Sequence, residues 1–144
     1  GGSLLETTIE AELAADHRIV SANDDVVVLC PFASGVPYEM LIVPREQHGH
    51  LPDASDASLQ AVGIALRDAV GQLNATIGDV AFNLGFHTAP HQHSGDYHWH
   101  VHIWPQLTTQ AGFERGDLGG EFMAIQGIAF FQAQRITGTE PDRL

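Results

Sequence analysis

The sequence is poor in several features that define large classes of protein. It has a single cysteine, Cys30, so no internal disulfide framework is available, and we expect a protein of a reducing compartment, the cytoplasm. No apolar run approaches the roughly 20 residues that a membrane-spanning helix needs. No signal-peptide pattern opens the chain either, which fits the expectation of a cytoplasmic protein.

Positive charge is also scarce. The chain has no lysine, and its 6 Lys and Arg residues stand against 18 acidic ones, giving a formal net charge of -12. A field of this sign repels polyanions, so we expect neither nucleic acid nor a membrane surface as a partner. A small phosphorylated ligand is still compatible with this charge where local donors hold it.

Apolar residues, in contrast, are plentiful. They make up 44% of the 144 residues, which is enough for a substantial core, and we take residues 1–144 as one domain. The leading Gly1-Gly2-Ser3 is typical of a cloning remnant.

Hydrophobic periodicity predicts an α+β fold. In the clearest helix, apolar residues recur at spacings of three and four: Leu59, Val62, Leu66, Val70, Leu73 and Ile77. Asp53, Ser55 and Asp56 are its N-cap candidates, and Gly78 fits its end. We expect another helix at 4–15 and strands at 19–22, 26–32, 38–44, 80–86 and 98–104, while 122–134 fits either a helix or a buried strand. The simplest assembly is a mostly antiparallel sheet with one long helix packed across it.

The most informative segment is 98–104, where histidine alternates with large apolar residues: His98, Trp99, His100, Val101, His102, Ile103 and Trp104. Because successive side chains of a strand point to opposite faces, the three imidazoles are expected to share one face, whereas Trp99, Val101 and Ile103 share the other and can be buried. Six of the nine histidines of the chain lie within 87–102. Such a cluster of groups that titrate near neutral pH predicts a functional site.

Two chemistries are open to these histidines. The outer two imidazoles of the segment are about 13 Å apart at the backbone of a regular strand, so all three cannot bind one ion. Two of them can, with a third ligand from elsewhere, because zinc and iron draw imidazoles in to near 2 Å. His87 is the first candidate for that ligand, and His91 and His93 are further ones. Alternatively, the central histidine attacks phosphorus and carries a nucleotidyl group, while its neighbours bind phosphate oxygens.

Segment 98–104 matches the signature of the histidine-triad superfamily at all seven positions. Members of that superfamily transfer or hydrolyse nucleotidyl groups. More specifically, the chain resembles the C-terminal half of galactose-1-phosphate uridylyltransferases, through 28–33, 38–45, 86–90 and 97–114. The resemblance covers about residues 4–116 and implies a histidine-triad α+β domain.

The resemblance implies two different sets of site residues. In two-domain uridylyltransferases, the C-terminal half holds a metal through histidines that correspond to His87, His100 and His102. The fourth ligand is an acidic residue of the other half and has no counterpart here. In single-domain histidine-triad enzymes, the middle histidine, here His100, is the nucleophile, with His98 and His102 as its catalytic neighbours and Asn83 in support.

The resemblance also bears on ligands and assembly. Cys30 stands about where single-domain enzymes hold the ribose with an acidic residue. Glu114 and Arg115 lie in a region that binds sugar in the family, often in the partner subunit, and a homodimer is implied. After 112–116 the tail departs from the family pattern.

Three hypotheses follow for a chain that acts on a nucleotide or sugar phosphate. The first is a nucleotidyltransferase or phosphohydrolase with His100 as nucleophile. The second is an enzyme whose histidines hold a divalent transition metal, zinc or iron, which activates water or polarises an oxygen. The third is a non-catalytic metal-binding domain equivalent to the C-terminal half of a uridylyltransferase.

Overall fold

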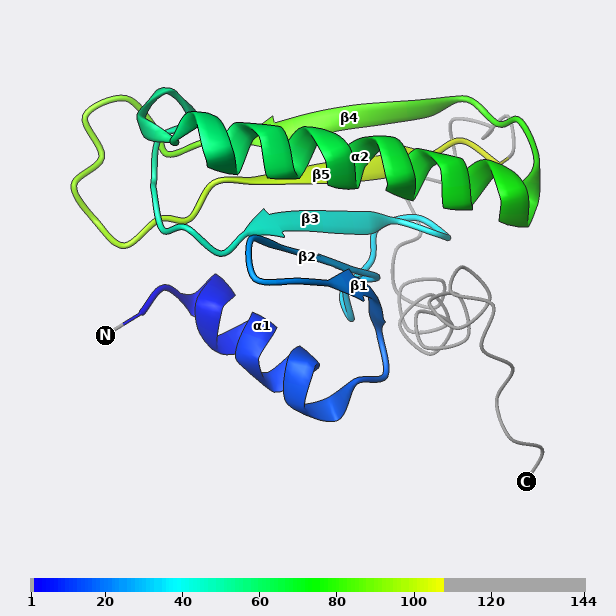
Figure 1. Ribbon diagram of the computed structural model, residues 1–144, viewed down its shortest axis with the longest axis horizontal. Helices are drawn as coiled ribbons and strands as arrows, with labels where there is room; N and C mark the ends of the chain where they lie inside the picture. The colour runs from blue at the N-terminus through cyan, green and yellow to red at the C-terminus, as the bar shows by residue number, and fades with distance from the viewer. Residues whose placement is uncertain (1, 108–144) are drawn as a thin grey trace, which may run out of the picture.

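The computed structural model describes residues 2–107 and confirms the α+β class. The elements follow in the order α1 (Leu4–Ala15), β1 (Ile19–Ala22), β2 (Val26–Leu29), β3 (Met40–Pro44), a 3-10 helix η1 (Leu51–Asp53), α2 (Asp56–Ile77), β4 (Phe82–His87) and β5 (His100–Pro105) (Figure 1). None of the helices in the described part of the chain has the length and apolar character needed to cross a membrane. The segment 122–134 lies outside the described residues.

The strands form one antiparallel sheet in the order β1-β2-β3-β5-β4. Strand β5 therefore lies between β3 and β4, and β4 is at an edge of the sheet that the described strands form. The register places His87 opposite His100 and Gly85 opposite His102. Two histidines of neighbouring strands are thus brought side by side by backbone pairing alone.

Helix α2 covers one face of the sheet, as expected for the one long helix. Its N-cap is Ser55, whose hydroxyl oxygen accepts the backbone N–H of Ser58, and it ends at Gly78, whose φ of 85° favours glycine. Its apolar stripe is part of a core cluster to which all five strands contribute, and the fully buried residues of this core include Leu73, Met40, Ile42, Trp99, Val101 and Ile103. The prediction that Trp99, Val101 and Ile103 are buried is confirmed.

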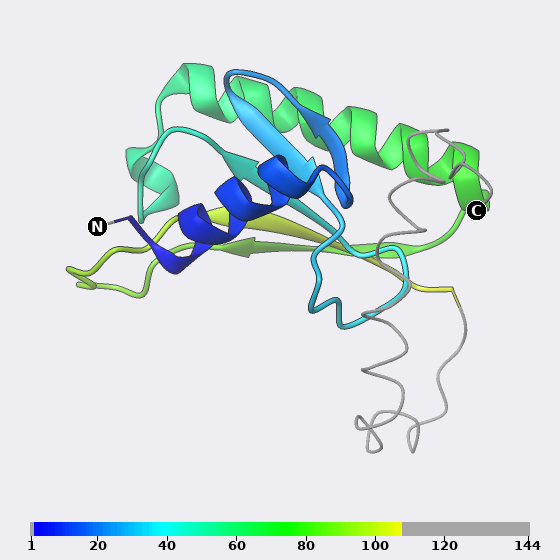
Figure 2. The same cartoon turned by 90° about the horizontal axis from the view of Figure 1, so that it is seen from below.

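Helix α1 lies on the opposite face of the sheet (Figure 2). It packs Ile9 against a second apolar cluster on β2 and β3, which includes Val27, Leu41 and Val43. A capping box starts the helix: the Ser3 side chain accepts from the Glu6 backbone, and the Glu6 carboxylate accepts the Ser3 N–H. Ser3, which is typical of a cloning remnant in the sequence, therefore has a structural role as a helix cap.

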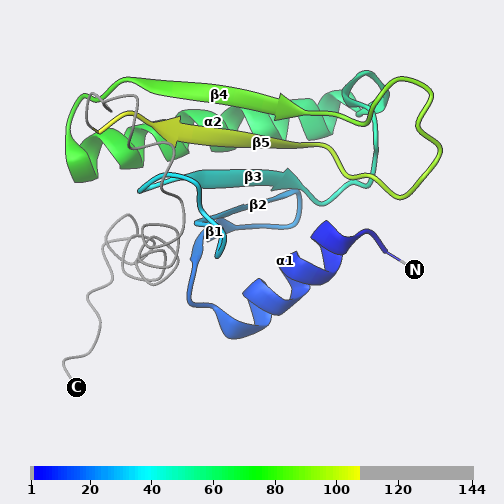
Figure 3. The same ribbon diagram turned by 180° about the vertical axis from the view of Figure 1, so that it is seen from behind.

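The described residues cover this second face only in part. Viewed from behind, β4 and β5 lie in front of α2, while α1 lies beside β1 and β2 (Figure 3). The alternate residues of β4 and β5 that point away from α2 are therefore left for a site. They include His87 of β4 and His100 and His102 of β5.

The bounds of four strands differ from the prediction; β4 covers Phe82–His87 rather than 80–86, and β5 ends at Pro105 rather than at residue 104. Strand β2 ends at Leu29, just before Cys30 and Pro31, because proline has no N–H to donate to the sheet. Strand β3 begins at Met40, since Tyr38 has a φ of 59°, which is incompatible with an extended strand. Strand β5 begins at His100 rather than two residues earlier.

The close packing of β4 on β5 makes Gly85 sensitive to substitution. A Cβ atom at this position would lie 2.4 Å from carbons of the Trp104 indole ring. We expect Gly85→Ala to displace the indole and to lower the free energy of unfolding by about 1–3 kcal/mol, the usual cost of overpacking. Urea denaturation measures this.

Gly63→Ala is the matched control. Gly63 lies in α2, where an added Cβ meets nothing within 4 Å. This substitution should stabilise the protein by up to about 1 kcal/mol, because alanine is the better helix former. Equal effects of the two substitutions would contradict the proposed clash.

Candidate functional site

Three imidazoles converge on the open face of β4 and β5. His87, at the end of β4, faces His100 and His102 of β5, with ring centroids 5.0 and 4.4 Å away, and the two β5 rings are 5.0 Å apart. One nitrogen from each ring lies within 4.8 Å of the others, which qualifies the set as a potential metal centre. His100 and His102 are half-buried and His87 is the most exposed of the three.

Hydrogen bonds fix the orientation of the two β5 rings. His100 Nδ1 lies 2.9 Å from the carbonyl oxygen of His98, and His102 Nδ1 lies 2.8 Å from Glu39 Oε1. A carbonyl or carboxylate oxygen only accepts, so both Nδ1 atoms carry the proton and donate. The lone pair of each ring is therefore on Nε2. This is the arrangement that metal-ligating and nucleophilic histidines share.

The environment favours the neutral form of His87 and His100. Burial lowers the pKa of His100 to about 4, with further lowering from the neighbouring His102 and His87, although its bond to the His98 carbonyl opposes the shift. The pKa of His87 is also lowered, again mainly by desolvation and then by His102. At pH 7 His100 and His87 therefore offer lone pairs rather than positive charge.

His98 is placed apart from this cluster. It precedes β5, is 5% exposed, and its Nε2 lies 2.6 Å from the carbonyl oxygen of Pro44 at the end of β3. Nε2 must donate, so His98 has the opposite tautomer to His100 and His102. Its Nδ1 has no hydrogen-bond partner within the described residues. The backbone N–H of the next residue, Trp99, bonds the His48 carbonyl, which explains why the regular strand starts only at His100.

Aromatic side chains flank the cluster on both sides. Trp104 stacks on His102, with centroids 4.9 Å apart and planes at 14°, and Tyr97 stacks on His100 at 6.2 Å and 20°. The Trp104 indole N–H also donates to Glu39 Oε1. The flanking residues and Glu39 were not identified from the sequence. The sequence feature that could have pointed to Glu39 is the position of its carboxylate immediately before the apolar run 40–44.

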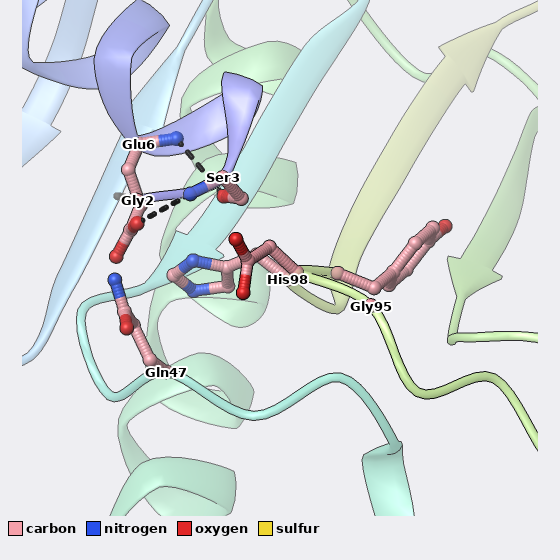
Figure 4. A pocket seen from close by; sticks show the side chains of 8 residues that line it. Gly2, Ser3, Glu6, Gln47, Gly95 and His98 are labelled. Atoms are coloured by element: carbon pink, nitrogen blue, oxygen red, sulfur yellow. Dashed lines mark hydrogen bonds between the residues drawn. The ribbon is translucent and has the colours of Figure 1, made fainter.

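A cavity of about 290 Å³ lies beside His100. Its lining comes from the first turns of α1 and the segment before β5: Ser3, Leu4, Leu5, Thr8, Asp96, Tyr97, His98 and His100. A neighbouring hollow of about 180 Å³ shares several of these residues and adds Glu6 and Gln47 (Figure 4). The space next to the histidines is therefore shaped by α1 on one side and by the loop before β5 on the other.

Other residues singled out from the sequence are placed as follows. Asn83 of β4 lies opposite Trp104, on the histidine face, and is exposed. His91 and His93 are exposed in the loop after β4 and outside the cluster. Cys30 is fully buried, and burial, with a contribution from Glu39, raises its pKa to about 12, so it is no nucleophile. Glu114 and Arg115 lie outside the described residues.

The model of a protein family, the C-terminal domain of galactose-1-phosphate uridyl transferase, matches residues 1–126. The chain belongs to this family. Solved histidine-triad proteins share its fold, with TM-scores of 0.66 and 0.58 at 19% and 11% identity.

The curated relatives of this chain include proteins named as uridylyltransferases and as a phosphorylase. The galactose-1-phosphate uridylyltransferase of Haemophilus influenzae is 26% identical over 126 residues, which cover 85% of this chain and 36% of that protein. The ADP-glucose phosphorylase of Arabidopsis thaliana is 27% identical over 109 residues, covering 73% and 31%. A solved uridylyltransferase mutant superimposes with a TM-score of 0.80 at 24% identity, covering 96% of this chain and 47% of that one. The chain thus spans about a third of the length of these curated relatives.

Proposed function

We propose that this chain is a domain of a nucleotidyl-transferring enzyme that acts on sugar nucleotides or sugar phosphates. Family membership supports the reaction type, and relatives named uridylyltransferase and ADP-glucose phosphorylase support the substrate class. The cavity beside His100 supplies space for a ligand next to the histidines.

For the histidine cluster we propose a divalent transition metal, zinc or iron. The observation that carries this proposal is the convergence of one nitrogen each from His87, His100 and His102 within 4.8 Å. The ring tautomers fit such an ion, because Nδ1 of both β5 histidines is bonded to an acceptor and Nε2 is left as the ligand atom. A bound ion would polarise a phosphate oxygen or activate water.

The protein's own groups prepare the site for this role. His87, the pKa of which is lowered, and His100 are neutral at pH 7, so no proton has to be removed before they bind. The described residues offer three ligands, which leaves a position of a four-coordinate ion for water, substrate or a group from elsewhere.

The metal proposal predicts a stoichiometric ion that depends on His87. Purified protein reconstituted with zinc and passed over a desalting column should retain about one ion per chain, measured by plasma mass spectrometry. His87→Ala should lose most of it, because the two remaining histidines of one strand form an incomplete site. Removal of the ion by a chelator should lower the melting temperature of the wild type.

His91→Ala serves as the control, since His91 is an exposed histidine outside the cluster. It should keep both the ion and the melting temperature. A wild-type protein that retains no ion, and whose melting temperature a chelator leaves unchanged, would refute the metal proposal.

A second candidate role for the cluster is nucleophilic catalysis by His100. The bond from its Nδ1–H to the His98 carbonyl favours this role, since it orients Nε2 and would stabilise the positive charge that the ring acquires. Nε2 would form a bond to the α-phosphorus of a sugar nucleotide while the bond from that phosphorus to the oxygen of the departing sugar phosphate breaks. A phosphorylated acceptor would then take the nucleotidyl group and restore the neutral ring.

The two roles compete for the same lone pair and can be told apart by trapping. Metal-free protein is mixed with UDP-glucose or ADP-glucose labelled in the nucleoside and quenched within milliseconds in alkali, in which phosphorus–nitrogen bonds survive. The nucleophilic role predicts label on the wild type and on His91→Gln, and none on His100→Gln. Label that persists in His100→Gln, or no label on a folded wild type with either nucleotide, would exclude His100 as the nucleophile.

We also propose that the chain forms a homodimer through β4. Of the described strands only β5 pairs with β4, so the other side of the β4 backbone is open. Two apolar side chains of β4, Leu84 and Phe86, are 39% and 51% exposed. Open strand edges with apolar side chains favour pairing with a second copy.

Light scattering on the eluting protein should therefore give twice the 15.5 kDa mass of the chain at micromolar concentration. Introducing lysine at both Leu84 and Phe86 should halve the mass, because charged groups would face each other across the new strand pair. Leu4→Lys, at an apolar position of α1 that is 86% exposed, is the control and should stay dimeric. A monomeric wild type would contradict the proposal.

A further inference from the structure

A buried carboxylate lies directly behind the histidine cluster. Glu39 is 4% exposed and immediately precedes β3, whose first residue Met40 pairs with Ile103, between the two β5 residues that the carboxylate contacts. Its Oε1 receives His102 Nδ1 at 2.8 Å and Trp104 Nε1 at 3.1 Å. Its Oε2 receives the backbone N–H of Gly35 at 2.6 Å. Both oxygens are therefore in use.

The nature of these donors determines the tautomer of His102. An indole N–H and a backbone N–H can only donate, so both oxygens of Glu39 act as acceptors. An ionised carboxylate has no proton to give, and burying it is costly unless its oxygens are hydrogen-bonded. His102 must therefore donate from Nδ1, and its Nε2 is left with the lone pair that faces His87 and His100.

The same carboxylate also fixes the plane of the His102 ring. Trp104 is held by its N–H on the oxygen that binds His102, and its indole stacks on the imidazole at an interplanar angle of 14°. At its other oxygen, Glu39 is tied to the backbone at Gly35 rather than to another mobile side chain. Glu39 thus holds the ring at one edge, and the indole that Glu39 binds covers one face.

We infer that Glu39 is a positioning residue that sets the tautomer and orientation of His102 for ligand binding. Without it, the proton of His102 is free to move to Nε2, and the cluster then offers two lone pairs instead of three. The tautomer of His102 is set by Glu39 whether or not a metal is bound. Its consequence for metal affinity rests on the metal centre proposed above.

The decisive experiment is Glu39→Gln, examined first without metal. Glutamine has the same shape, but its NH2 must face either Gly35 N–H or the two ring donors, so one arrangement of the amide pushes the His102 proton to Nε2. Long-range nitrogen–proton spectra of the imidazoles, recorded with a chelator at about pH 8, where free imidazole is neutral, report the tautomer directly. The His102 signals are identified by their loss in His102→Gln.

We expect the wild type to carry the His102 proton on Nδ1, and Glu39→Gln to show a mixture or the Nε2–H form. Zinc affinity, measured by competition with a chromogenic chelator, should fall 10–100-fold in Glu39→Gln, the usual effect of losing such a partner. Glu46→Gln is the matched control, because Glu46 is a carboxylate 3.3 Å from another histidine, His48, away from the cluster. It should change neither readout.

The outcomes separate this inference from the proposal on which its second part rests. A folded Glu39→Gln protein that keeps the Nδ1–H tautomer of His102 overturns the inference, and so does a wild type with the proton on Nε2. A wild type that binds no zinc removes the metal proposal while the tautomer result still stands. If Glu39→Gln does not fold, Glu39→Asp replaces it: the shorter carboxylate reaches less far, so zinc affinity should again fall, and unchanged affinity counts against the inference.

Discussion

The candidate site depends on the antiparallel pairing of β4 with β5. This pairing alone brings His87 beside His100, and it puts Gly85 opposite His102, where the missing side chain leaves space for the Trp104 indole. A shift of the register by one residue would turn His87 to the other face of the sheet. The convergence of the imidazoles is thus a property of strand pairing, supported by one close glycine contact.

Uneven coverage of the sheet then decides which face becomes a site. Helix α2 buries one face, including Trp99, Val101 and Ile103, whereas α1 packs on the other face over β2 and β3. The histidines therefore lie in a partly enclosed region rather than in the core. Burial is sufficient to keep His100 neutral, since it lowers the pKa to about 4, yet a cavity remains next to the ring.

Most of the described fold could be predicted from the sequence, and the changed bounds of β2 and β3 have local causes. The spacing of Leu59 to Ile77 predicted α2, and both Ser55 and Gly78 were among the candidates for its ends. The strand 98–104 was predicted two residues too long at its start because alternation continues through His98. The backbone there bonds the loop at His48 instead of β3, a contact between distant segments that no local pattern encodes.

The sequence by itself determined the chemistry available to this protein: an alternating histidine strand, a separate His87, and an acidic chain with a single cysteine. These are local properties of composition and spacing. Tertiary structure decided which histidines join the cluster and which one is placed apart from it. It turned the Nε2 of His98 to the Pro44 carbonyl and gave His102 a buried carboxylate 63 positions away in sequence. Hydrogen-bond partners across such separations follow from sheet order and register, which become defined only when the strands assemble.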